Sequence, residues 1–257
     1  MLKTFLIDGD KGGVGKTLTA RALLSYFYAA REDVRIAAID ADQSNPDVCG
    51  KGGVERDHRV CLSELVALGE KDGWLDLAQS MDPLLGFKDD VRCVINLPAQ
   101  IGMRAFIAGE SLADEYAEPY NMIPVWVIGP RPESIAALDY RVKNFPTLFR
   151  RGAVVRNQHL GSPDDFAAWD ASPLRQRLTA AGWVDVALPT MSPRLVEMLG
   201  RKLPIAGMAS STGSGEVGPF SNSPWNGWLP WGYRLALTAW LRKSDASMSQ
   251  IEALGDA

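Results

Sequence analysis

The segment Lys11–Thr17, which reads KGGVGKT, limits the possible fold of this chain more than any other. It follows an apolar run at 2–7 that predicts a β-strand, and it precedes a predicted helix over 16–30 whose apolar residues recur every three or four positions. A Gly-rich turn between a strand and a helix binds anions. Its backbone N–H groups point at phosphate oxygens, and the helix N-terminus adds about half a positive charge. The segment therefore predicts a phosphate-binding loop.

Alternating apolar and helical segments follow this loop along most of the chain. Further strands are expected at 34–39, 91–97, 122–128, 153–155 and 184–188, and further helices at 62–68, 133–144 and 173–181. Such alternation is typical of a parallel sheet with helices on both faces. We therefore expect an α/β protein with a mostly parallel, doubly wound sheet, the fold of P-loop nucleoside triphosphatases, and ligands at the carboxyl ends of its strands.

The length of 257 residues fits one large α/β domain, which we expect to span 1–243. A Gly/Ser/Pro-rich stretch at about 210–232 contains Trp225, Trp228 and Trp231 and is expected to be an ordered, tryptophan-rich insertion. It leads into a predicted helix from Gly232 to Lys243. The remainder, 244–257, is expected to be a flexible tail. The polar, Gly-rich stretch at 43–59 is expected to be a mobile loop.

Composition excludes several classes of protein. No apolar run approaches the roughly 18 residues of a membrane span, and the first residues do not resemble a secretion signal. The net charge of −4 and the pI of about 5.3 argue against a wholly basic nucleic-acid binder. The three cysteines form no CxxC pair, as expected for reduced thiols in a cytoplasmic protein.

The phosphate loop carries a family resemblance. The usual Walker A pattern has glycine where this chain has Asp10, and a second lysine, Lys11, begins the loop. KGGVGKT resembles the deviant Walker A motif of the ParA/MinD family of ATPases. The resemblance implies that Lys11 reaches the nucleotide of a dimer partner, that Lys16 reaches the β- and γ-phosphates, and that the Thr17 hydroxyl binds Mg²⁺. The ATP-binding segment implied is Gly12, Gly13, Val14, Gly15, Lys16, Thr17 and Leu18.

Other strand ends resemble the same family. In Ile39–Gln43, Asp40 would hold Mg²⁺ through water, and Asp42 would position the attacking water or sense the γ-phosphate. Asn96 stands where most members carry the Walker B aspartate, which predicts weaker Mg²⁺ binding or slow turnover. Asn157 corresponds to an asparagine that reads adenine, and Pro189 to a residue beside the base.

The resemblance implies an ATP-dependent switch that forms a homodimer with ATP and hydrolyses it slowly until a partner protein stimulates it. ParA-like members segregate or position plasmid DNA or other cargo and bind DNA non-specifically, which would associate this protein with the nucleoid. Basic residues are available for phosphate contacts, but the acidic 244–257 segment argues against a membrane anchor. The basic candidates are Arg141, Lys143, Arg150, Arg151, Arg175, Arg177, Arg201, Lys202, Arg242 and Lys243.

Three alternatives stay open. Asn96 is compatible with a nucleotide-binding adaptor that has little turnover. The Lys11-type loop also occurs in metallocluster-carrier ATPases, for which Cys49, Cys61 and Cys93 would have to supply ligands. The fold and loop are also shared by biosynthetic amide ligases, although no Cys–His pair for a glutaminase is visible.

Overall fold

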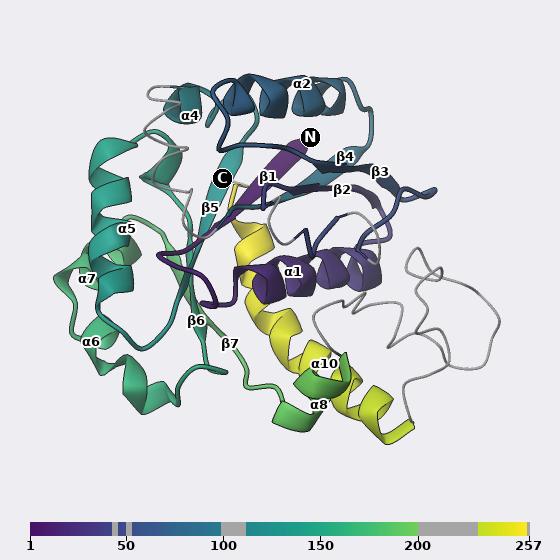
Figure 1. Ribbon diagram of the computed structural model, residues 1–257. Helices are drawn as coiled ribbons and strands as arrows, with labels where there is room; N and C mark the ends of the chain where they lie inside the picture. The colour runs from purple at the N-terminus through teal and green to yellow at the C-terminus, as the bar shows by residue number, and fades with distance from the viewer. Residues whose placement is uncertain (43–45, 50–52, 99–111, 200–230, 256–257) are drawn as a thin grey trace.

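A computed structural model describes residues 1–42, 46–49, 53–98, 112–199 and 231–255. At its centre lies a seven-stranded sheet with the order β3-β2-β4-β1-β5-β6-β7, in which every pairing between neighbouring strands is parallel (Figure 1). The strands are β1 Leu2–Asp8, β2 Val34–Asp40, β3 Val60–Leu65, β4 Asp90–Asn96, β5 Met122–Ile128, β6 Ala153–Asn157 and β7 Val184–Leu188. The expected α/β class and doubly wound parallel sheet are confirmed.

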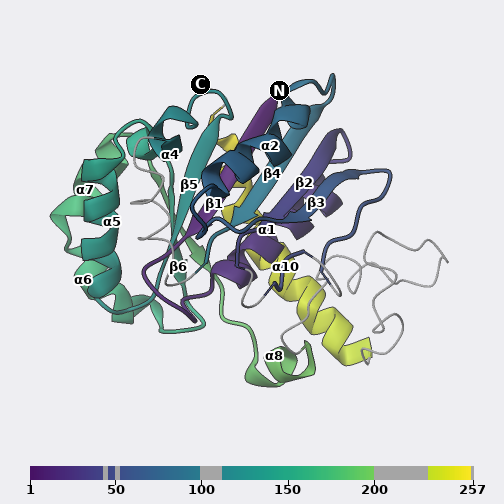
Figure 2. The same cartoon turned by 45° about the horizontal axis from the view of Figure 1, so that its top comes forward.

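Two helical layers cover the sheet, and each buries a separate apolar cluster (Figure 2). One face carries α1 Lys16–Ala30, α8 Pro193–Leu199 and α10 Trp231–Ala253. The other carries α2 Gly73–Leu85, α4 Leu112–Glu115, α5 Glu133–Asn144, α6 Ala167–Asp170 and α7 Pro173–Ala180, with the short 3₁₀ turns Leu148–Arg150 and Pro163–Phe166. The strands read as continuous apolar runs because both of their faces are covered.

The central strand β1 shows why the site forms where it does. All seven of its residues are buried, and it pairs with β4 on one side and β5 on the other. Its last residue, Asp8, therefore lies beside the ends of β4 and β5, and the chain turns from there directly into α1. The loop between β1 and α1 consequently lies at the carboxyl edge of the sheet, where β2 and β4 also end.

The helix predicted over 62–68 is wrong. Residues 60–65 form the edge strand β3, which pairs in parallel with β2. Leu62, Leu65, Val66 and Leu68 happen to have helical spacing, which produced the prediction. Burial alternates along the strand instead, with Val60 and Leu62 inside, so long-range pairing with β2 outweighed the local pattern. The helix on this side is α2, which the sequence reading did not identify.

The prediction of a flexible tail from residue 244 is also wrong for the described part. The helix expected to end at Lys243 continues to Ala253. Ser244, Met248, Ile251 and Glu252 are buried, since this helix packs along α1 and β7. The tryptophan-rich insertion at about 210–232 lies almost entirely outside the described residues.

The stretch at 43–59 was expected to be a mobile loop, but its described part is packed against the core. Val48, Cys49 and Val54 are buried, and Cys49 forms a parallel bridge with Val54. The described part of this loop therefore packs into the core under the end of β2.

Candidate nucleotide-binding site

The loop between β1 and α1 has the backbone of an anion cradle. Gly13 has φ +77° and Gly15 φ +106°, values in the left-handed region that favours glycine. Gly12 and Gly13 are exposed, and a Cβ built on Gly13 would meet nothing within 4 Å. Behind the loop, a Cβ on Gly15 would lie 2.2 Å from the Asn157 Nδ2. One side of the loop is thus open to a ligand, and the other is closed against β6.

The two lysines of the loop have different surroundings. Lys16 is 6% exposed, and its Nζ donates to the Lys11 carbonyl oxygen over 3.0 Å. Burial lowers the pKa of Lys16, while the carboxylates of Asp8, Asp42 and Asp10 oppose that change. The Lys11 side chain is 43% exposed and lies 4.0 Å from Asp10. Lys16 is therefore held inside its own loop, whereas Lys11 extends into solvent at the rim.

Two acids beside the loop are held by α5. The buried Asp8 accepts a hydrogen bond from the Gly9 N–H over 2.7 Å, and its Oδ2 lies 3.3 Å from Arg141 Nη2. Asp10 accepts a 2.5 Å hydrogen bond from the Ser134 hydroxyl. From sequence, Asp10 was noted only as a departure from the usual Walker A pattern, and Arg141 only as a basic candidate for DNA contacts. Asp8 and Ser134 were assigned no role in the site. A charged residue at the end of a buried strand was an available signal for Asp8, but nothing local marked Arg141 as its partner.

Asp40 ends β2 inside a dense set of hydrogen bonds. Its Oδ1 accepts from the Asp42 N–H over 3.1 Å and from Asn96 Nδ2 over 3.0 Å, and its Oδ2 accepts from the Val48 N–H over 2.7 Å. Burial raises the pKa of Asp40, and these donors partly offset the rise. The parallel register of β2 and β4 places Asp40 directly beside Asn96. The structure thus brings together the two strand-end residues that were singled out for the metal.

Arg21 on α1 contacts the loop segment that binds Asp40. It is buried and donates to the carbonyl oxygen of Asp47, next to the Val48 N–H that binds Asp40. Burial lowers its pKa to about 10, and Asp47 and Asp40 oppose that change. No sequence pattern indicated this contact, because Arg21 lies within an otherwise ordinary helical segment.

Asn157 and Pro189 have structural contacts of their own. The Asn157 Nδ2 donates to the Val14 carbonyl oxygen over 2.9 Å, and its Oδ1 accepts from the His159 N–H over 3.1 Å. The Pro189 carbonyl oxygen accepts from Trp240 Nε1 over 2.8 Å, which ties the end of β7 to α10. The amide of Asn157 is thus directed at the phosphate loop itself, a different contact from the adenine edge expected from the resemblance.

The residues at this edge fit a nucleotide with magnesium. The exposed glycines offer N–H groups and the helix N-terminus to phosphate. The Asn96 Oδ1 is buried and has no hydrogen-bond partner in the described part of the chain. A water held by a magnesium ion would supply the missing donor, and Mg²⁺ in such sites keeps several waters. Thr17, half-buried at the start of α1, and Asp40 are the residues that would hold the ion.

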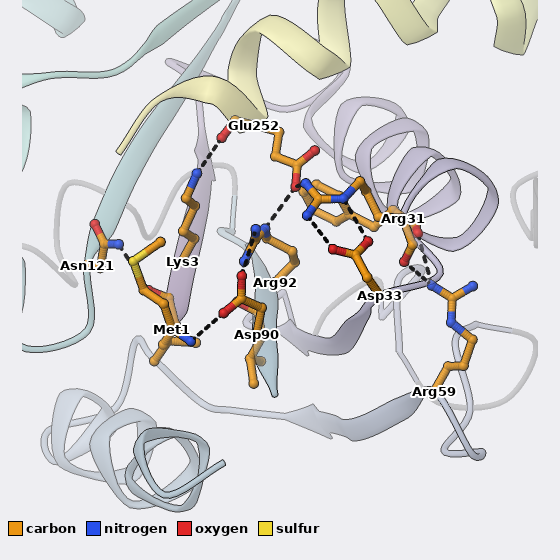
Figure 3. A network of polar contacts seen from close by, with 12 residues as sticks. Met1, Lys3, Arg31, Asp33, Arg59, Asp90, Arg92, Asn121 and Glu252 are labelled. Carbon is orange, nitrogen blue, oxygen red and sulfur yellow. Dashed lines mark hydrogen bonds and ion pairs between the residues drawn. The ribbon is translucent and has the colours of Figure 1, made fainter. Parts of the chain in front are cut away.

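A second polar cluster lies at the opposite edge of the sheet, where the strands begin (Figure 3). Glu252 of α10 accepts from Arg92 Nε over 2.9 Å and from Arg31, and Lys3 Nζ donates to its carbonyl oxygen over 2.8 Å. Lys3, Arg92 and Glu252 are buried. These contacts join the end of α10 to β1, β4 and α1, far from the phosphate loop. They explain why the last turns of this helix are packed.

The described residues offer little support for a metallocluster. They contain no group of three or more His, Cys, Asp or Glu side chains suited to a metal ion. Burial raises the pKa of Cys49 to about 12 and also raises the pKa of Cys61 and Cys93.

Five of the eight basic candidates for DNA binding that lie in the described residues have acidic partners. Arg150 lies 2.8 Å from Glu118, Arg175 lies 2.6 Å from Asp185, and Lys143 and Arg177 flank Asp139. Arg141 is buried against Asp8, and Arg151 donates to Asn121. Arg242 and Lys243 are exposed on α10, and Arg201 and Lys202 fall outside the described residues. No helix in the described part is long and apolar enough to cross a bilayer.

Comparison with known proteins agrees with the fold. No family model matches the chain. Protein MobD of Acidithiobacillus ferrooxidans is 33% identical over 194 residues, which are 74% of this chain and 79% of MobD. The MinC:MinD cell division complex of Aquifex aeolicus gives a TM-score of 0.50 at 18% identity, over 79% of this chain and 87% of that one. A variant of Cyanothece McdA in complex with ATP also gives 0.50, at 16% identity over 92% and 96%.

Proposed function

Since this chain belongs to the ParA/MinD family of deviant Walker A P-loop ATPases, we propose that it is an ATP-dependent switch that dimerises around bound nucleotide and positions or segregates a cargo. The observation that carries the proposal is the contrast between the two loop lysines. Lys16 is buried in its own loop, and Lys11 is exposed at the rim. Lys16 would neutralise the phosphates bound to its own subunit. Lys11, at the rim, would reach the γ-phosphate bound to a neighbouring subunit.

The nucleotide would lie across the N-terminus of α1. Backbone N–H groups of the loop from Gly12 to Leu18 would bind the phosphates, and Lys16 would add a positive charge beside them. ATP bound there with Mg²⁺ supplies the γ-phosphoryl group whose presence distinguishes the two states of the switch. The Thr17 hydroxyl and Asp40 would hold the ion. Asp42, two residues after Asp40, would position the attacking water. Its carboxylate already favours the charged form of Lys16.

Asn157 and Pro189 contribute to the same pocket in this proposal, at β6 and β7. The hydrogen bond from Asn157 to Val14 supports a role in shaping the loop, in addition to any contact with the base. Pro189 is half-buried at the end of β7, where a base would approach.

A second candidate function is a nucleotide-binding adaptor with little turnover. Asn96 favours it, because this side chain donates to Asp40 and brings no negative charge of its own. Magnesium would then rely mainly on Asp40 and the phosphates, which predicts weak metal binding and slow hydrolysis. The two candidates share the pocket and the dimer and differ in the rate of phosphate release.

DNA is the cargo contact that the resemblance suggests. The exposed pair Arg242 and Lys243 on α10 is the described candidate for phosphate contacts, although Asp245 lies within electrostatic reach of Arg242. Dimerisation would double this pair. Association should weaken steeply with salt, as counterion release requires.

The test is light scattering after size-exclusion chromatography, in Mg²⁺ with ADP or with a non-hydrolysable ATP analogue. We expect one chain of 28.0 kDa with ADP and two chains with the analogue. Lys11→Ala is expected to bind nucleotide without pairing, and Lys16→Ala to lose nucleotide. A wild-type protein that binds the analogue and stays monomeric would refute the switch.

Two further measurements separate the remaining choices. Phosphate release with and without a candidate stimulating partner distinguishes an ATPase from an adaptor. Sedimentation with DNA at low salt, comparing the wild type with Arg242→Ala/Lys243→Ala, tests the DNA contact. Equal sedimentation of both proteins would remove this pair from the proposal, and no ATP-dependent sedimentation at all would remove DNA.

A further inference from the structure

Two acids flank the phosphate loop, and a single helix contacts both of them. Asp8 is 1% exposed at the end of β1, and the Asp10 side chain is 8% exposed one residue before Lys11. Their partners, Arg141 and Ser134, lie seven residues apart on the same face of α5. Negative charge beside a phosphate site weakens anion binding unless it is compensated. The contacts from α5 therefore bear on whether this loop can bind a nucleotide.

The ion pair between Asp8 and Arg141 is buried on both sides. Arg141 is 4% exposed, and its guanidinium lies 6.0 Å from the centre of the Phe145 ring. Burial raises the pKa of Asp8, and Arg141 is the strongest influence against that rise. Burial likewise lowers the pKa of Arg141, and Asp8 is the strongest influence against that change. Each group is therefore the main compensation for the buried charge of the other.

The Lys16 ammonium also lies within electrostatic reach of the Asp8 carboxylate. Asp8 is the acid that acts most strongly on the buried Lys16 ammonium, ahead of Asp42 and Asp10. One Lys16 donor already goes to the Lys11 carbonyl oxygen. If Asp8 lost its guanidinium partner, Lys16 would be the remaining cation able to compensate it. An ammonium drawn toward Asp8 would neutralise that acid instead of a phosphate.

We propose that Arg141 is a positioning residue for nucleotide binding: by neutralising Asp8 it keeps the Lys16 ammonium available to the phosphates. The inference rests on the proposed function, because it requires nucleotide in the loop. Ser134 fixes the position of the second acid without changing its charge, since its hydroxyl donates to Asp10 beside Lys11. The Trp126 indole N–H donates to the Ser134 carbonyl oxygen over 3.2 Å and fixes the start of α5 against β5. Helix α5 would thus set the charge balance of the loop.

The experiment is calorimetric titration of Mg-ADP into four proteins: the wild type, Arg141→Gln, Arg141→Lys and the double variant Asp8→Asn/Arg141→Gln. We expect Arg141→Gln to weaken ADP binding by at least about tenfold, equivalent to about 1.4 kcal/mol. Arg141→Lys retains the charge and should lose less. The double variant removes the acid that would capture Lys16, so its affinity should return to within about threefold of the wild type.

A matched control addresses general destabilisation. Arg92→Gln also breaks a buried arginine–carboxylate pair, with Glu252, at the opposite edge of the sheet (Figure 3). It should lower the melting temperature without weakening ADP binding. If Arg141→Gln does not fold, the double variant still decides the question, because a purely structural role for Arg141 predicts no recovery of affinity.

The outcomes distinguish the inference from the function on which it rests. If the wild type bound no ADP, the proposed function and this inference would both fail. If the wild type bound ADP and Arg141→Gln bound it equally well, only the inference would fail. A folded double variant that stayed as weak as Arg141→Gln, or an equal loss of affinity in Arg92→Gln, would also overturn it.

Discussion

Replacing Asn96 by aspartate tests directly the site proposed for Mg²⁺ beside Asp40. The change turns a donor that lies 3.0 Å from Asp40 into a second buried carboxylate. Two unit charges at that separation would repel by about 5 to 6 kcal/mol at an effective dielectric constant of about 20. The pair would avoid this cost by retaining one proton, which also preserves a hydrogen bond between the two side chains. Keeping a proton at pH 7 on a group with an ordinary pKa near 3.9 costs about 4 kcal/mol.

The sign of the pH dependence follows from this proton. Mutual repulsion adds to the burial that already raises the pKa of Asp40, so the folded pair has a higher pKa than the unfolded chain. The destabilisation is then largest above the folded pKa and decreases as pH falls toward the unfolded pKa. We expect Asn96→Asp to reduce the free energy of unfolding by about 3 to 4 kcal/mol at pH 7, and by about 1.5 kcal/mol at pH 5.

Urea denaturation of the wild type and Asn96→Asp at both pH values, with and without Mg²⁺ and nucleotide, measures these differences. Mg²⁺ with nucleotide should stabilise the variant more than the wild type, because the second carboxylate adds charge to the ion's site. Asn96→Ala is the matched control, since it adds no charge. It loses a hydrogen bond that lowers the pKa of Asp40, so its pH dependence should have the same sign and be smaller than that of Asn96→Asp. A variant as stable as the wild type at pH 7 without metal, or equally destabilised at both pH values, would refute this account of the Asp40 corner.

Three further substitutions probe the loop and the distant charge cluster. Gly15→Ala forces alanine into a left-handed φ, which costs about 1 to 2 kcal/mol, and its Cβ would clash with Asn157. Calorimetry should therefore detect no ADP binding, and retained affinity would contradict the close packing. Asn157→Ala leaves a loop carbonyl without its donor and should lower unfolding free energy by about 1 to 3 kcal/mol, with weaker ADP binding; denaturation curves that overlay the wild type would argue against the contact. Glu252→Gln removes the buried carboxylate that Arg31 and Arg92 share and leaves them only Asp33 and Asp90 as acidic partners, so it should cost at most about 3 to 5 kcal/mol. Hydrogen exchange should then speed up in the last turns of α10, and unchanged protection there would show that this cluster does not anchor the helix.

The sequence determined the class of the fold and the position of the site. The strand at 122–128 was identified with its observed bounds, and the other strands with continuous apolar runs to within one or two residues, because a strand buried on both faces has few polar positions that could be confused with another element. The helix at 16–30 was likewise identified, since the phosphate-loop motif marks its first turn. In a parallel sheet the strand ends share one edge, so placing Asp40 and Asn96 together also followed from the sequence.

The short edge strand and the C-terminal helix needed the tertiary structure. Residues 60–65 carry apolar residues at spacing that suits a helix equally well, and only pairing with β2 decides between the two. The last turns of α10 look polar in sequence because Glu252 is among them. Its carboxylate is nevertheless buried, since arginines from two other segments converge on it.

Within the site, the sequence could identify groups but not their partners. Lys11, Lys16 and Asp40 were recognised by their place in a motif or at a strand end. The ion pair of Asp8 with Arg141 joins residues 133 positions apart, and the contact of Asn157 with the loop joins residues 143 apart. Neither contact has a local pattern, because each depends on how α5 and β6 lie beside the end of β1 and the loop that follows it. Local chemistry determined where a phosphate can bind, and only the packing of distant elements decided how the charges around it are balanced.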